Sequence, residues 1–243
     1  MKKIALVAVF SLLSFGLMAA EEVVNTNNDS TNISNQISRN SIIIGFGGAS
    51  NSMKVQDNDG DWGRISDFDA KTNFNLAYLR KLSAFNNKLS IGADFTMFMN
   101  KGMDEESVET DSYGVWKDYS KASYDTYTLM LLTDYELARF SKFDISAQLG
   151  LGFAFNLLDS SYGYSYISGT HSSSYSASGK GSSAVAAAKI GLVANYNFAK
   201  HFAVGAGFHY LYMGESKITI YDEDNNLKNN GTMTYNVNLK WMF

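Results

Sequence analysis

Residues 234–243, with the sequence TYNVNLKWMF, alternate between two kinds of side chain. Successive side chains of a β-strand point to opposite faces, so a strand here has one apolar, aromatic-rich face and one mostly polar face. The apolar face consists of Tyr235, Val237, Leu239, Trp241 and Phe243. We therefore predict an amphipathic strand, and the same pattern recurs along the chain.

Seven earlier segments show this alternation, at about residues 41–49, 68–80, 89–100, 126–137, 143–157, 186–198 and 202–212. The links after the second, fourth and sixth segments are short, whereas the other links are long and polar. An even number of strands with short turns at one end and long loops at the other is typical of outer-membrane barrels. The sequence therefore predicts an all-β fold, an eight-stranded antiparallel up-and-down transmembrane β-barrel, over residues 39–243.

Residue size distinguishes a membrane barrel from a soluble ligand-binding barrel. The less apolar face of the segments is mostly Gly, Ala, Ser, Thr and Asn, whereas a water-exposed surface would be rich in charged residues. Small side chains fit the narrow interior of an eight-stranded barrel. Aromatic residues gather near the segment ends on the apolar face, as at Phe68 and Tyr78, where a membrane barrel places its aromatic girdles. We therefore expect the apolar face to contact lipid.

With this pattern, this topology and the terminal Phe243, the chain resembles the small outer-membrane β-barrel family that includes the transmembrane domain of OmpA, OmpX and the Opa adhesins. The resemblance covers residues 39–243 and includes no internal family motif. It implies a bacterial outer-membrane location, with both termini in the periplasm and with lipid and lipopolysaccharide as partners. It also implies that the outer-membrane assembly machinery recognises the final strand, through Tyr235, Val237, Leu239, Trp241 and Phe243.

The first 38 residues differ in composition from the rest. Residues 1–20 combine two lysines, an apolar stretch and a final Ala19-Ala20, which is typical of a secretory signal peptide cleaved after Ala19 or Ala20. Residues 21–38 are rich in Asn and Ser, and we expect a flexible periplasmic segment. The whole chain has a net charge of −4 and no cysteine. This mild acidity argues against a nucleic-acid partner.

The inner face would carry several charged and polar residues. Isolated charges in a narrow interior are costly, so we expect them to pair. Asp94 and Lys189 fall near mid-height on the third and sixth strands, and we predict that they pair, directly or through Asn73, Asn75, Gln148 or Asn195, and plug the lumen. Inward glycines work against this prediction, since they would leave room for water. The predicted polar network comprises Lys71, Asp94, Asp134, Glu136, Asp144, Gln148, Lys189, His209 and Lys240.

No motif predicts catalysis, a cofactor or a metal site. The sequence Asp57 to Asp61 resembles a calcium loop, but Trp62 and Phe68 stand where an EF-hand needs Gly and a bidentate acid. His171 and Ser173 resemble the His-x-Ser pair of barrel lipid A deacylases, but no acid is clearly placed to orient the imidazole. We therefore expect a non-enzymatic protein, with a lipid A-modifying enzyme as a less favoured alternative.

The long connections, residues 50–67, 101–122, 158–182 and 214–230, are the predicted surface for an extracellular ligand. The third contains Tyr162, Tyr164, Tyr166 and Tyr175 among Ser and Gly. This composition suits a binding surface, and it equally suits an extension of the fifth and sixth strands above the membrane. The sequence thus predicts a mostly plugged barrel with a structural or adhesion-like role. The alternative is a narrow porin-like channel for small solutes.

Overall fold

The computed structural model describes residues 39–56, 62–65, 71–99, 103–220 and 223–243. The predicted signal peptide and periplasmic segment lie outside these residues, as does the calcium-like sequence at residues 57–61. Within the described residues, no helix is long and apolar enough to cross a membrane.

Eight long strands form a closed antiparallel barrel in which each strand pairs with its neighbours in sequence order. The ring closes where the last strand pairs with the first, for example at Ile44 with Leu239. The strands are β1 (Asn40–Gln56), β3 (Lys71–Lys81), β4 (Leu89–Met99), β6 (Val115–Phe140), β7 (Phe143–Ser168), β8 (His171–Ala199), β9 (Phe202–Met213) and β11 (Glu223–Met242). The predicted fold class and strand number are confirmed.

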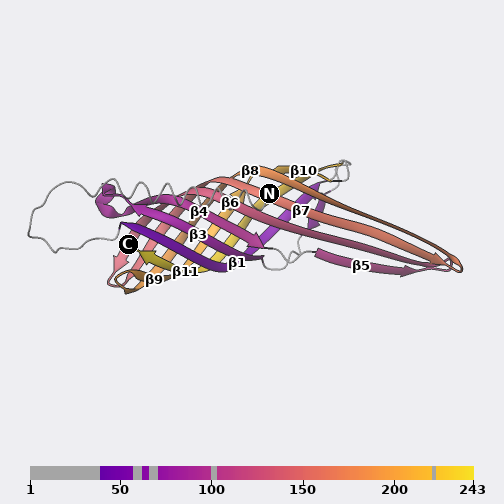
Figure 1. Cartoon of the computed structure of the whole chain (residues 1–243), viewed down its shortest axis with the longest axis horizontal. Coiled ribbons are helices and arrows are strands. Elements are labelled where there is room, and N and C mark those ends of the chain that lie inside the picture. The colour runs from indigo at the N-terminus through magenta and orange to yellow at the C-terminus, as the bar shows by residue number, and fades with distance from the viewer. Residues whose placement is uncertain (1–38, 57–61, 66–70, 100–102, 221–222) are drawn as a thin grey trace, which may run out of the picture.

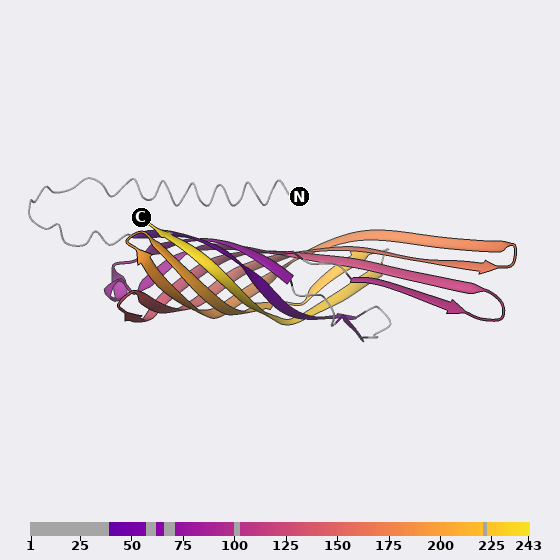
Figure 2. The same cartoon turned by 90° about the horizontal axis from the view of Figure 1, so that it is seen from below.

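The long connections are largely strand in the described residues, which corrects the expectation of loops except at residues 158–182, where a strand extension was one of the two explanations. Three short strands lie in these connections: β2 (Trp62–Ile65) pairs with β1, β5 (Met103–Thr110) with β6, and β10 (Ser216–Ile220) with β11. β7 and β8 remain paired from the barrel to Ser168 and His171. Of the two explanations for the tyrosine-rich segment, a strand extension describes its backbone. Figure 2 shows these strands projecting beyond one end of the barrel.

We call this projection the extension sheet. It comprises residues 103–110 of β5, 115–122 of β6, 160–168 of β7 and 171–179 of β8, which pair in the order β5-β6-β7-β8. A two-residue turn joins β7 to β8, and its first residue, Gly169, has φ +58°. This backbone conformation is open to glycine and strained for most other residues.

The opposite end of the barrel has short connections. A 3₁₀ turn, η1 (Ala84–Asn87), joins β3 to β4, and two-residue turns join β6 to β7 and β8 to β9. Asn40 and Phe243 exchange two backbone hydrogen bonds of 2.9 Å at this end. The first and last described strands therefore meet beside the short turns.

The two faces of the barrel wall have opposite character. Leu151 and Leu192 point outward with 58% and 54% of their surfaces exposed, whereas Asp94 and Lys189 point inward with 0% and 8% exposed. A water-soluble protein has the reverse arrangement, because burying charge and exposing apolar surface both cost free energy in water. Lipid contact removes this apolar surface from water, and the predicted assignment of the two faces is confirmed.

We expect Leu151→Arg or Leu192→Arg to destabilise the membrane-embedded barrel by about 2–4 kcal/mol, because each places a charge near the middle of the apolar belt. Urea unfolding in lipid vesicles measures this loss. Ser174→Arg in the exposed part of β8 is the control and should change the unfolding free energy little. Equal tolerance of arginine at Leu151 and Ser174 would mean that the outer face does not contact lipid.

Candidate functional site

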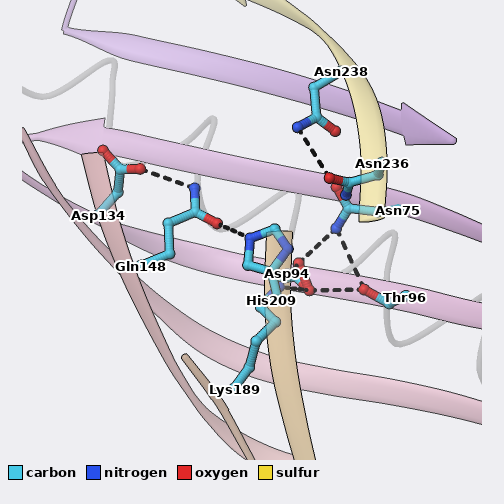
Figure 3. A network of polar contacts seen from close by, with 9 residues as sticks. All are labelled: Asn75, Asp94, Thr96, Asp134, Gln148, Lys189, His209, Asn236 and Asn238. Carbon is cyan, nitrogen blue, oxygen red and sulfur yellow. Dashed lines mark hydrogen bonds and ion pairs between the residues drawn. The ribbon is translucent and has the colours of Figure 1, made fainter. Parts of the chain in front are cut away.

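The centre of the lumen is occupied by an ion pair between β4 and β8. Lys189 Nζ donates to both carboxylate oxygens of Asp94, at 2.8 and 2.7 Å. β4 and β8 are not adjacent strands, so the pair crosses the interior (Figure 3). The predicted pairing of Asp94 with Lys189 is therefore confirmed, in its direct form.

Two neutral side chains complete the surroundings of Asp94. Asn75 Nδ2 on β3 donates to Asp94 Oδ2 at 2.6 Å, and Thr96 Oγ1 on the same strand as Asp94 donates to Oδ1 at 3.0 Å. The carboxylate thus accepts hydrogen bonds from three residues. A buried ion pair needs such additional bonds to offset the cost of removing its charges from water.

A second cluster surrounds Asp134 on β6. Ser146 Oγ and Gln148 Nε2 both donate to Asp134 Oδ2, at 2.9 and 2.8 Å. The other end of the Gln148 amide, Oε1, lies 2.9 Å from His209 Nε2 on β9. Because an amide oxygen only accepts hydrogen bonds, Nε2 is the nitrogen of His209 that carries the proton. The chain Asp134–Gln148–His209 spans β6, β7 and β9.

A third carboxylate, Asp144 on β7, accepts hydrogen bonds from two asparagines of β8. Asn195 Nδ2 donates to Oδ1 at 2.8 Å, and Asn197 Nδ2 donates to Oδ2 at 2.7 Å. Asp134 and Asp144 are thus bound by neutral amide and hydroxyl donors. The general expectation was that isolated lumen charges are costly unless paired, and amide and hydroxyl donors take that role here, because hydrogen bonds to the ionised carboxylate also stabilise it.

The remaining predicted network residues are Glu136, Lys240 and Lys71. Glu136 lies near the short-turn end, where it contacts Arg139 Nη2 at 2.5 Å and Lys81 Nζ at 3.8 Å. Lys240 is partly buried and lines the central cavity. Lys71 begins β3, but its side chain lies outside the described residues.

The inward glycines do not leave the lumen open, which corrects the expectation that they make room for water. A Cβ atom at Gly191 would collide with His209, and one at Gly205 would collide with Asn195. A Cβ at Gly207 would collide with Asn236 as well as with His209. Larger polar side chains of neighbouring strands therefore occupy the space beside these glycines.

Two apolar clusters inside the lumen were missed by the sequence analysis. Phe98 lies beyond Asp94 on β4, and Leu211 lies beyond His209 on β9, on the side of the extension sheet. The first cluster comprises Ala49, Phe98, Met130, Ala154, Ala187, Leu211 and Met213, and the second comprises Ile43, Ala77, Leu79 and Leu132. Strand alternation alone predicts that the residues of both clusters point inward. Their apolar side chains differ from the polar lining that we predicted for the lumen.

The polar and apolar side chains together fill the lumen. Among the described side chains, a cavity of about 30 Å³ is lined by Asp94, Lys189, His209 and their neighbours. A cavity of this size holds about one or two water molecules. Among the described residues, no group of three or more His, Asp or Glu side chains is arranged to hold a metal ion.

The other histidines lie away from the network. His201 is exposed in the turn between β8 and β9, with Nδ1 2.9 Å from the carbonyl oxygen of Met242. His171 is exposed at the first position of β8, two residues before Ser173, at the tip of the extension sheet.

Comparisons with known proteins found solved structures of low sequence identity. No protein-family model and no curated protein match the sequence. Among solved structures, Ail of Yersinia pestis is 17% identical, with 84% of this chain and 100% of Ail covered and a TM-score of 0.42. OprG of Pseudomonas aeruginosa is 15% identical (85% and 96% covered, TM-score 0.45), and the protease OmpT of Escherichia coli is 8% identical (88% and 100% covered, TM-score 0.45).

Closure of the ring, with an apolar exterior and a polar, filled interior, decides the class of this protein. It is a transmembrane β-barrel of the outer-membrane type. In this barrel the residues of the predicted assembly signal form an exposed row on the outer face of β11 and at the residue that follows it: Tyr235, Val237, Leu239, Trp241 and Phe243. Their recognition by the assembly machinery stays a prediction.

We expect Lys189→Met to destabilise the barrel by about 3–5 kcal/mol, because it leaves the Asp94 carboxylate buried without its cation. The double variant Asp94→Asn/Lys189→Met should recover much of this loss, and urea unfolding in lipid vesicles measures both. The exposed Asp159–Lys180 pair is the control: Asp159→Asn and Lys180→Met should each cost under about 1 kcal/mol. Additive effects of Asp94→Asn and Lys189→Met would contradict a coupled pair.

Proposed function

We propose that this protein is a non-enzymatic bacterial outer-membrane barrel with a closed lumen, and that its extension sheet is an extracellular interaction surface. Both termini would then lie in the periplasm. The single observation that carries the closed lumen is the Asp94–Lys189 pair, which crosses the interior with both carboxylate oxygens bound.

The surroundings of this pair support closure. The apolar cluster that contains Phe98 and Leu211 lies between the polar network and the extension sheet. The cavity of about 30 Å³ beside the pair is too small for most solutes other than water. A narrow porin-like channel would need a continuous water-filled path through both the polar network and the apolar cluster.

The lengths of the connections support this orientation. In outer-membrane barrels the short turns lie on the periplasmic side and the long connections on the outside. The extension sheet projects from one end, and Asn40 and Phe243 meet beside the short turns at the other end. Lipid and lipopolysaccharide would surround the apolar belt, and the assembly machinery would act on the exposed row of β11.

The chemistry of the lumen supports a role other than catalysis. The carboxylates of Asp94, Asp134 and Asp144 accept hydrogen bonds within the network. Their oxygen atoms are therefore engaged by neighbouring side chains and are not directed at a substrate. A lipid A-modifying enzyme remains the alternative at His171 and Ser173. Release of acyl groups from lipid A that depends on His171 would identify it.

In planar bilayers we expect the wild-type barrel to conduct little, because paired and packed side chains fill its lumen. Lys189→Ala should raise the conductance, since it removes the side chain that crosses the interior. Lys180→Ala, at the base of the extension sheet, is the control and should leave the conductance unchanged. A large, steady wild-type conductance that is insensitive to Asp94 and Lys189 substitutions would favour the narrow channel.

Attachment of bacteria that display the barrel tests the second part of the proposal. The trimmed variant replaces residues 104–121 and 160–179 each by an Asn-Gly turn, which joins register-paired positions. Cells are compared on wells coated with matrix protein, mucin glycan, polylysine or nothing. We expect the full-length barrel to increase attachment to at least one coating relative to the trimmed variant at equal surface amounts. Equal attachment on every coating would refute an interaction role for the extension sheet.

A further inference from the structure

One face of the extension sheet carries a continuous row of aromatic rings. The Trp116 and Tyr166 ring centroids are 4.2 Å apart, and Trp116 lies 6.4 Å from Tyr164. Tyr164 continues to Tyr175 at 5.8 Å, and Tyr175 to Tyr162 at 5.7 Å. The five rings come from β6, β7 and β8 and link all three strands.

This aromatic face is the continuation of the inner face of the barrel. Even-numbered residues of β7 point into the lumen, as Gln148 does, and Tyr162, Tyr164 and Tyr166 keep the same parity. β7 and β8 pair from the barrel to their common turn without a register shift. The opposite face of the extension sheet continues the lipid-facing side.

The aromatic rings remain exposed although the strands beneath them are held in place. Between 39% and 47% of the surfaces of Trp116, Tyr162, Tyr164 and Tyr175 are exposed. Asp111 Oδ1 accepts hydrogen bonds from the backbone N–H groups of Tyr113 and Gly114 and fixes the β5–β6 turn. The Tyr166 hydroxyl donates to the Tyr113 carbonyl oxygen at 3.1 Å. A partner would thus meet an aromatic surface that is already ordered, which lowers the entropy cost of binding.

The two faces of the extension sheet differ in charge: the described side chains of the aromatic face include carboxylates and no lysine, whereas the other face carries both lysines and Glu106. Asp118 stands directly opposite Tyr164 in the β6–β7 register, and Glu109 stands opposite Trp116 in the β5–β6 register. Register partners share a face of a sheet, so these carboxylates lie among the rings. The lysines of this region, Lys117, Lys121 and Lys180, occupy alternate positions and fall on the other face.

We propose that the aromatic face binds an extended polypeptide segment rich in arginine and lysine. The proposal rests on the proposed function, in which the extension sheet is an extracellular interaction surface. Guanidinium and ammonium groups are attracted to the faces of Trp and Tyr rings, and arginine also stacks on them. Asp118 and Glu109 provide opposite charge beside the same rings, so one cationic side chain can contact a ring and a carboxylate together.

The carboxylates of the aromatic face favour this partner over a neutral oligosaccharide. Sugar rings also stack on aromatic side chains, but a neutral ligand would make no use of the charges of Asp118 and Glu109. An anionic glycan would be repelled by Asp118 and Glu109. The described charges of the aromatic face therefore select a cationic ligand.

Peptide binding to the full-length barrel in detergent micelles tests the proposal. The probe is a fluorescein-labelled peptide of alternating arginine and serine, and the control peptide has citrulline in place of arginine. Citrulline keeps the shape of arginine but is neutral. We expect fluorescence anisotropy to show at least about tenfold tighter binding of the arginine peptide, and we expect salt to weaken that binding.

Matched variants locate the site on one face. Trp116→Ala, Tyr164→Ser and Asp118→Asn should each weaken binding about threefold to tenfold, whereas Trp116→Phe should keep most of it because a ring remains. The controls lie on the opposite face of the same strands: Tyr119→Ser and Glu106→Gln should change the affinity less than twofold. Heat-modifiable migration in gel electrophoresis verifies that each variant is folded.

Three results would overturn the proposal: equal binding of the citrulline peptide, equal loss of binding in Tyr119→Ser and Trp116→Ala, or displacement of the arginine peptide by a neutral chito-oligosaccharide. Any of these three results would still be compatible with the proposed function if the attachment of cells that display the barrel depends on the extension sheet. Attachment that is the same for full-length and trimmed barrels would instead refute the proposed function itself.

Discussion

Lipid offers no hydrogen-bond partners, and this constraint determines the architecture of the chain. Each backbone N–H and C=O group in the hydrocarbon layer must be satisfied by the protein, and a sheet does this only when its first and last strands pair. Pairing of β1 with β11, from Ser41 with Met242 onward, completes that ring. The alternation of each strand then follows, because one face of the closed wall contacts lipid and the other faces a narrow interior.

The narrow interior creates a second requirement, since it is too small to hydrate its own charges fully. The barrel meets this requirement in two ways. Asp94 is bound by a cation and by neutral donors, whereas Asp134 and Asp144 are bound by amides and a hydroxyl. Apolar side chains such as Phe98 and Leu132 fill much of the remaining space. The lumen is therefore packed like a protein core, although the barrel wall around it has an apolar outer face that contacts lipid instead of water.

Strand alternation was sufficient to predict the fold, the two faces of the wall and the Asp94–Lys189 pair. These features depend on residue parity and on approximate height in the membrane, which a sequence records directly. The space beside Gly191 and Gly205 was misjudged because the side chains that fill it, His209 and Asn195, belong to other strands and depend on register. The length of β7 and β8 was also underestimated, because a strand with water on both sides needs no apolar alternation. Ser, Gly and Tyr then serve equally well in a loop or in a sheet.

The continuity of β7 has a mechanical consequence. The strand runs for 26 residues from Phe143 beside a short turn to Ser168 at the tip, a contour length of about 85 Å at the rise of a β-strand. A pull on the tip is carried by a single covalent backbone into the barrel wall. Because the tip is the turn between β7 and β8, the pull loads the hydrogen bonds of β7 to β6 and of β8 to β9 in shear, many at once, rather than opening them one after another. The extension sheet and the barrel therefore resist tension as one body, anchored by the full thickness of the membrane.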